Sequence, residues 1–105
     1  SSSAAGVTVK VTPKDVSPQA DAWTFAVVLD THSQDLRDDL ARTATLVDAR
    51  GGRHAPLAWE GAPAGGHHRE GVLRFKVPGA QQGSFELQIH RAGEQSPRVF
   101  RWTLQ

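Results

Sequence analysis

The amino-acid sequence predicts an all-β fold, namely an antiparallel immunoglobulin-like β-sandwich of about seven strands. Short runs of residues alternate between apolar and polar, which is the period of a half-buried strand. Gly, Pro and Asp separate these runs at intervals of roughly 8–15 residues, as in small sandwiches. No stretch of helical length repeats its apolar residues with a 3.6-residue period. A small β-barrel is the main alternative architecture.

The N-terminal half of the chain contains the strongest strand signal. Three valines alternate with polar residues over 7–12, and Pro13 is expected to end this strand. Residues 13–21 are predicted to form a loop. Residues 23–29 are apolar on both faces, so we expect this strand in the centre of a sheet. The polar residues 30–42 predict a long crossing loop with one short helical or 3₁₀ turn.

The middle of the chain is predicted to form a hairpin. Residues 43–48 have the pattern of a strand, and Gly51-Gly52 tolerates the positive φ that tight hairpin turns require. The return strand is expected over residues 54–59. Because Pro56 interrupts it, this strand is expected at the edge of a sheet.

Three further strands are predicted in the C-terminal part of the chain, over residues 70–77, 85–89 and 100–104. Pro78-Gly79 separates the first two, and Ala92-Gly93-Glu94 makes a hairpin between the last two. Alternation within these strands predicts core-facing side chains at Leu73, Phe75, Val77, Phe85, Leu87, Ile89, Phe100, Trp102 and Leu104.

The length and composition favour one globular domain. The 105 residues are enough for a single core, which we assign to residues 7–105, with residues 1–6 as a disordered N-terminal tail or linker. The net charge of +1 gives little support to nucleic-acid binding. No apolar run approaches the ~20 residues of a membrane span, so the chain is not expected to cross a membrane. The absence of Cys and Met excludes disulfides and thiolate or thioether metal sites.

The most informative stretch is 57–71, where a Trp and a Glu precede a Gly-rich turn and two histidines and an Arg follow it. Loops on a rigid scaffold commonly carry binding groups. Imidazole and carboxylate groups suit copper and zinc, so one hypothesis is a divalent metal site. Its candidate ligands are His32, His67, His68, Asp30 and Glu60.

The same residues also have a structural interpretation. His67 and His68 would bond to loop carbonyls or to Asp30 and so hold the Gly-rich loop in place. Trp59 would plug the space under the loop, with its indole N–H bonded to a carbonyl. Arg69 completes this loop cluster and is predicted to pair with Glu60. His54 and His90 are predicted to be plain solvated residues.

Catalysis is not expected from this sequence. Ser33 follows His32, but a catalytic triad is defined by spatial geometry and not by adjacency in the chain. Gly65-Gly66 lacks the Lys and Ser/Thr of a phosphate-binding loop. A sandwich of this size also offers little cleft in which to desolvate an acid pair.

Two segments resemble a poorly characterised family of exported bacterial and archaeal domains that carry DTHS and PLAWEG-PPGGHHR-GVLxF motifs. The matching segments are Asp30-Thr31-His32-Ser33, Pro56 to Gly61, Gly65 to Arg69 and Gly71 to Phe75, with Ala64 in place of a Pro. The resemblance covers roughly residues 7–104. It implies a periplasmic or secreted protein. Some members are joined to heavy-metal-binding segments, which implies metal handling through His32, His67 and His68.

Two functional hypotheses therefore remain open. In the first, a non-enzymatic exported domain binds copper or zinc through loop histidines. In the second, the domain is a structural or protein-interaction module in which the His, Trp and Gly motifs hold the fold together. A metal site needs at least three converging ligand groups with free lone pairs, whereas a structural cluster would already have those groups bonded.

Overall fold

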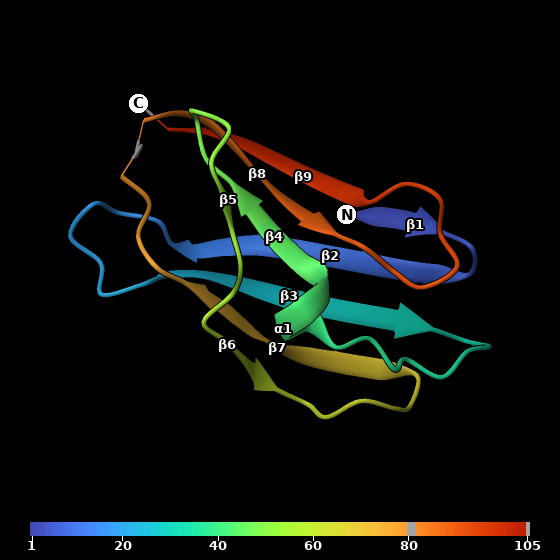
Figure 1. Cartoon of the computed structure of the whole chain (residues 1–105). Coiled ribbons are helices and arrows are strands. Elements are labelled where there is room, and N and C mark those ends of the chain that lie inside the picture. Colours follow the sequence, from blue (N-terminus) through green and yellow to red (C-terminus); the bar gives the residue numbers. More distant parts are fainter. Residues whose placement is uncertain (80–81, 105) are drawn as a thin grey trace.

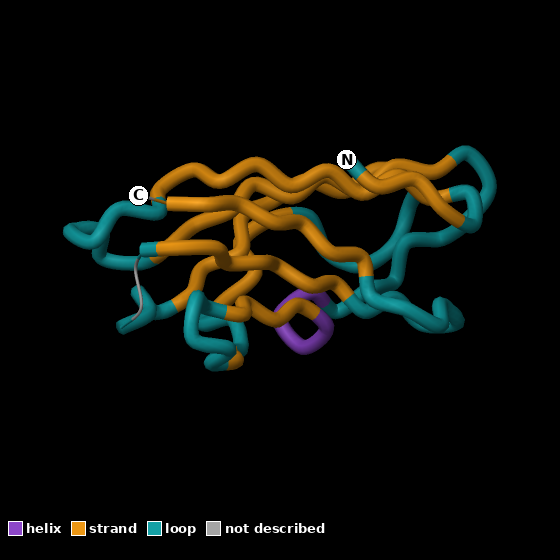
Figure 2. The backbone as a smooth tube through the Cα atoms, turned by 90° about the horizontal axis from the view of Figure 1, so that it is seen from above, coloured by secondary structure: helices purple, strands orange, loops and turns teal. Residues whose placement is uncertain are grey.

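Two antiparallel sheets pack face to face in the computed structural model, which describes residues 1–79 and 82–104 (Figures 1 and 2). In spatial order, the five-stranded sheet contains β1 (Ser2–Ala4), β2 (Val7–Asp15), β3 (Trp23–Thr31), β7 (His68–Phe75) and β6 (Ala58–Gly61). The four-stranded sheet contains β5 (Arg53–His54), β4 (Ala44–Val47), β8 (Gly83–Ile89) and β9 (Arg98–Leu104). The predicted β-sandwich is confirmed, with nine strands in place of about seven.

The core lies between the sheets and is centred on β3. This strand pairs with β2 on one side and with β7 on the other, as predicted for a strand that is apolar on both faces. Its inward residues Trp23, Phe25, Val27 and Leu29 are fully buried. Phe85 of the opposite sheet packs against Trp23 with their ring centroids 5.0 Å apart, so aromatic contacts join the two layers.

The structure differs from the prediction at the N-terminus. Ser2–Ala4, predicted as part of a disordered tail, forms β1 and pairs with Val7–Val9 of β2. The strand β2 also continues through Pro13, which was predicted to end it. Pro13 lies beyond the residues paired with β1, where β2 is an edge strand, and an edge tolerates a residue without an N–H. A register shift follows between Pro13 and Asp15.

The return strand predicted over residues 54–59 is two separate strands. Arg53–His54 forms β5 at the edge of the four-stranded sheet, and Ala58–Gly61 forms β6 at the edge of the five-stranded sheet. Pro56 lies in the segment where the chain passes from one sheet to the other. The pattern correctly indicated an edge but did not reveal the change of sheet.

The hairpin between β4 and β5 depends on Asp48. Its Oδ1 accepts hydrogen bonds from the backbone N–H groups of Arg50 and Gly52, both at 2.9 Å. Gly51 adopts φ +82°, a conformation that favours glycine. His54, predicted as solvated, is half-buried, with Nε2 2.8 Å from Asp48 Oδ2. This hydrogen bond is the largest contribution to the lowered pKa of Asp48.

The polar crossing loop after β3 ends in a short helix, α1 (Leu40–Thr43), as Figure 1 shows. Leu36 and Leu40 are fully buried and fix this loop to the core, although only Leu40 belongs to the helix. Within the described residues, no helix has the length and apolar character needed to cross a membrane.

A chain of buried ion pairs links this crossing loop to the β8–β9 hairpin. Asp38 accepts two hydrogen bonds from Arg91, and Glu94 lies between Arg91 and Arg98. The four side chains are only 3–14% exposed. Arg98, through its hydrogen bond, is the main cause of the lowered pKa of Glu94.

Arg98 also joins the two sheets. Its guanidinium donates to the backbone carbonyls of Ser2, Ala4 and Val7, at 2.8–2.9 Å. A planar guanidinium with five N–H donors can serve several acceptors at once, which no other side chain can do in the same space. Because Arg98 belongs to β9, these bonds attach β1 to the opposite sheet.

We expect Arg98→Met to lower the free energy of unfolding by about 3 kcal/mol, because Glu94 keeps only Arg91 as a partner and three carbonyls lose the guanidinium as a donor. The matched control is Arg101→Met on the same strand. The Arg101 side chain is 67% exposed, so this substitution should lower the free energy of unfolding by under about 1 kcal/mol. Urea unfolding of both variants measures the difference. Equal losses would contradict the structural role of Arg98.

Candidate functional site

The two motifs singled out in the sequence lie side by side at one end of the five-stranded sheet. Asp30 at the end of β3 pairs in register with His68 at the start of β7. Beyond the paired strands, the Thr31 N–H donates to the His67 carbonyl at 2.9 Å. The Leu36 N–H donates to the Gly66 carbonyl at 2.9 Å, and the Gly65 N–H donates to the Leu36 carbonyl at 2.6 Å. The loop before β7 is therefore bonded to the crossing loop after β3.

Gly65 and Gly66 let the chain reverse at this point. Both adopt positive φ, +113° and +81°, which L side chains rarely tolerate. The Gly66 N–H donates to Asp35 Oδ1 at 2.7 Å. This bond is the first cause of the lowered pKa of Asp35, followed by the hydrogen bond from Arg37.

Arg69 forms the centre of the cluster. It is 2% exposed. Its Nη1 donates to the carbonyls of Asp38 at 2.7 Å and Leu36 at 3.4 Å, and its Nη2 donates to the Ala62 carbonyl at 3.2 Å. Its Nε is buried and has no hydrogen-bond partner in the described part of the chain. One side chain thus holds the crossing loop and the Gly-rich loop together.

Trp59 lies against the same guanidinium. The Arg69 Cζ is 5.7 Å from the centroid of the indole ring, within the range of a cation–π contact. The indole N–H donates to the Ala62 carbonyl at 2.9 Å, which is the plug predicted from the sequence. The ring covers Gly71, where an added Cβ would lie 2.6 Å from two ring carbons. Gly71 is therefore needed for the ring to pack this closely against β7.

His68 lies on the outer face of the sheet, away from Arg69. Its Nδ1 is 2.5 Å from Asp30 Oδ1, and its Nε2 is 3.5 Å from Glu70 Oε1. The His68 and Asp30 side chains are each 54% exposed, so the group is open to solvent. The hydrogen bond to Asp30, and secondarily the charges of Asp30 and Glu70, raise the pKa of His68 above its ordinary value.

The other predicted ligands do not join this group. Glu60 lies 3.7 Å from Arg74, so the predicted pair of Glu60 with Arg69 is wrong; Arg69 uses its donors on carbonyls instead. His67 is exposed and contributes its backbone carbonyl to Thr31. Within residues 1–79 and 82–104, no cluster of three or more His, Asp or Glu side chains is placed to hold a metal ion.

His32 and Asp30 border a shallow pocket of about 320 Å³ on the outer side of the sandwich, together with Gly6, Thr8 and Thr31. The Thr31 hydroxyl donates to the Gly6 carbonyl at 2.8 Å, which ties β3 to the turn between β1 and β2. The pocket places His32 near Asp30, but His32 is not among the side chains that contact His68.

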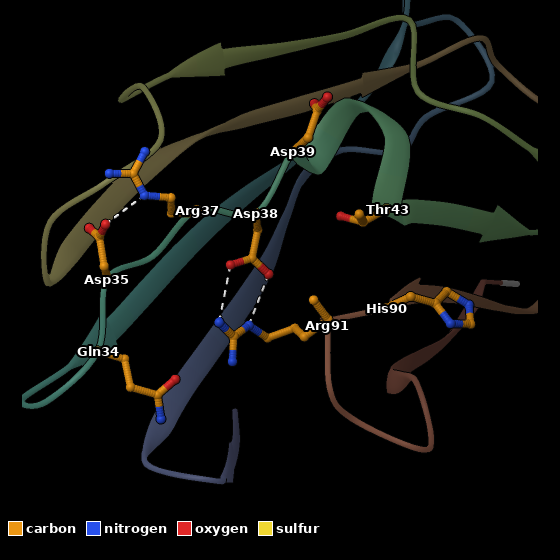
Figure 3. Close-up of a pocket in the computed structure, with 9 residues that line it drawn as sticks. Gln34, Asp35, Arg37, Asp38, Asp39, Thr43, His90 and Arg91 are labelled. Carbon is orange, nitrogen blue, oxygen red and sulfur yellow. Dashed lines mark hydrogen bonds and ion pairs between the residues drawn. The ribbon is translucent and has the colours of Figure 1, made fainter.

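Sequence reasoning missed a second pocket, between the crossing loop and the β8–β9 hairpin (Figure 3). It has a volume of about 330 Å³, and the paired side chains of Asp38 and Arg91 form part of its lining. Thr43 is also in the lining, and its buried hydroxyl has no partner among the described residues. The only sequence signal was the spacing Arg91, Glu94, Arg98, in which an acid stands between two arginines.

No protein-family model matches this chain, and comparisons with curated proteins and with solved structures found no similar protein. The resemblance to the exported domain family therefore stays a prediction from the motifs.

Proposed function

We propose that this chain is a non-enzymatic β-sandwich module that acts through contacts with other proteins, and that its His, Trp and Gly motifs serve to hold one end of the sandwich. The observation that carries the proposal is the burial of Arg69 with its donors on carbonyls of two loops. The most distinctive stretch of the sequence, residues 57–71, therefore serves to stabilise the fold.

The polar groups that remain outside this cluster support the same proposal. Glu60 is 59% exposed, and Asp30 and His68 are 54% exposed, so water solvates the groups that acid–base chemistry would need to desolvate. A net charge of +1 favours protein partners over nucleic acid. The motif resemblance supports export to the periplasm or the medium.

We expect Arg69→Met to lower the free energy of unfolding by about 2–4 kcal/mol, because three carbonyls lose a charged donor and Trp59 loses its contact. The matched control is Arg74→Met on the same strand, whose side chain is 38% exposed and pairs with Glu60 at 3.7 Å. It should cost under about 1 kcal/mol. Urea unfolding compares the two, and an equally small loss at both positions would refute a structural role for the motif.

Binding of copper or zinc is the second candidate function, and the geometry of His68 favours it. A metal-ligating His commonly donates one ring N–H to a carboxylate, as Nδ1 does to Asp30, while the other nitrogen faces the metal. Here Nε2 faces Glu70. His68 and Glu70 would supply two of the three or more protein ligands that a zinc site needs, and His32 or His67 would have to move to complete the set.

Calorimetric titration with Zn(II) and Cu(II) tests this second candidate. Because the raised pKa of His68 keeps its imidazolium protonated to higher pH, a metal has to displace that proton. We therefore expect one-to-one binding that tightens from pH 6 to pH 8 and is lost in His68→Ala but kept in His90→Ala. Weak binding that is indifferent to His68→Ala would exclude the metal site.

A further inference from the structure

The free edge of β9 differs from the other sheet edges of the described structure. β9 is seven residues long and pairs with β8 in one unbroken register from Gly83↔Leu104 to Ile89↔Arg98. The outer strands β1, β5 and β6 have two to four residues each. The open part of β2 contains Pro13 and a register shift, both of which protect an edge. The sequence of β9 contains no Pro, and Arg101 is its one exposed charged side chain.

The apolar side chains of β9 are also incompletely covered. Val99 is 44% exposed on the outer face. On the inner face Trp102 and Leu104 are only partly buried, although both pack against the core. The centroid of the Trp102 ring system lies 5.5 Å from that of Phe25 and 5.4 Å from that of Phe85, so this side chain attaches the strand to the core. An attached strand with open N–H and C=O groups is a template for a further strand.

We propose that a second copy of this chain occupies the edge, with β9 pairing antiparallel to β9 about a two-fold axis. This inference deepens the proposed interaction function and rests on it. The charge of the edge favours a second copy over a strongly charged partner. Arg101 is the one exposed ionic side chain of β9, and Glu86 of β8 neutralises it at 3.3 Å. The edge therefore carries no net charge that would select an acidic or a basic segment.

The register follows from the same residues. An axis at Trp102 places Arg101 opposite Thr103 and Phe100 opposite Leu104, so no like charges meet. An axis at Arg101 would place the two guanidinium groups opposite each other, which is unfavourable. An axis at Phe100 would place Arg98 of each copy opposite Trp102 of the other. The Arg98 side chain is already bonded to the carbonyls of β1. The pairing covers Phe100 to Leu104 in each copy, so we expect a weak dimer at the low end of interface sizes.

Opposite charges at position 103 give a sharp test of this register. By symmetry, each substitution acts twice at the interface, on Arg101 of both copies. Thr103→Glu adds two attractive pairs and should tighten the dimer roughly two- to thirty-fold. Thr103→Arg adds two repulsive pairs and should weaken it by a similar factor. Both variants lose the same exposed contact with Ser84, so the loss of that contact does not distinguish them.

Sedimentation velocity over a concentration series measures the dimer constant of the wild type and both variants. Thr12→Glu and Thr12→Arg are the controls, because Thr12 is exposed on the other sheet and should leave the constant unchanged. The proposal is overturned if the wild type and Thr103→Glu stay monomeric. It is also overturned if a dimer forms whose dissociation constant does not depend on the charge at position 103. Neither result bears on the unfolding of Arg69→Met. Failure of the dimer proposal can therefore be distinguished from failure of the proposed module function.

Discussion

A single polar network crosses one end of the sandwich, and the rest of the structure depends on it. Asp38 is the residue that joins its two halves. The Asp38 backbone carbonyl accepts from Arg69 at 2.7 Å, and its carboxylate accepts from Arg91 at 2.9 and 3.1 Å. From there Glu94 leads to Arg98 and the carbonyls of β1. The network therefore runs from the Trp59 side of the five-stranded sheet to its opposite edge.

Arg69 and Arg98 of this network donate hydrogen bonds to backbone carbonyls at this end of the sandwich. The chain has long connections at this end, and several of their backbone carbonyls are buried or partly buried and need hydrogen-bond donors from the protein. Arginine suits this position because its guanidinium stays charged and serves several acceptors from one point. Arg69 and Arg98 each hold carbonyls of two separate segments. The hydrophobic effect packs the two sheets together, whereas these two side chains fix how the ends of the strands are connected.

Period-two alternation was sufficient to predict the β-sandwich and the central place of β3, because successive side chains of a strand point to opposite faces. It could not predict that residues 54–59 divide between two sheets, since both edges accept the same pattern. The Trp59 plug was predicted from its position before a Gly-rich turn. The burial of Arg69 was not, because a charged residue next to two histidines has the appearance of a surface residue until its carbonyl partners, distant in the sequence, are known.

Native-state hydrogen exchange at the Leu36 amide tests the central claim most directly. Leu36 is fully buried in the crossing loop, and its N–H is bonded to Gly66. If the network fixes this end, the free energy of opening at Leu36 in the wild type lies close to that of Val27 in the middle of β3. In Arg69→Met it should then fall further than that of Val27. If Leu36 in the wild type already exchanges by local opening, with a free energy several kcal/mol below that of Val27, the network does not hold the loops.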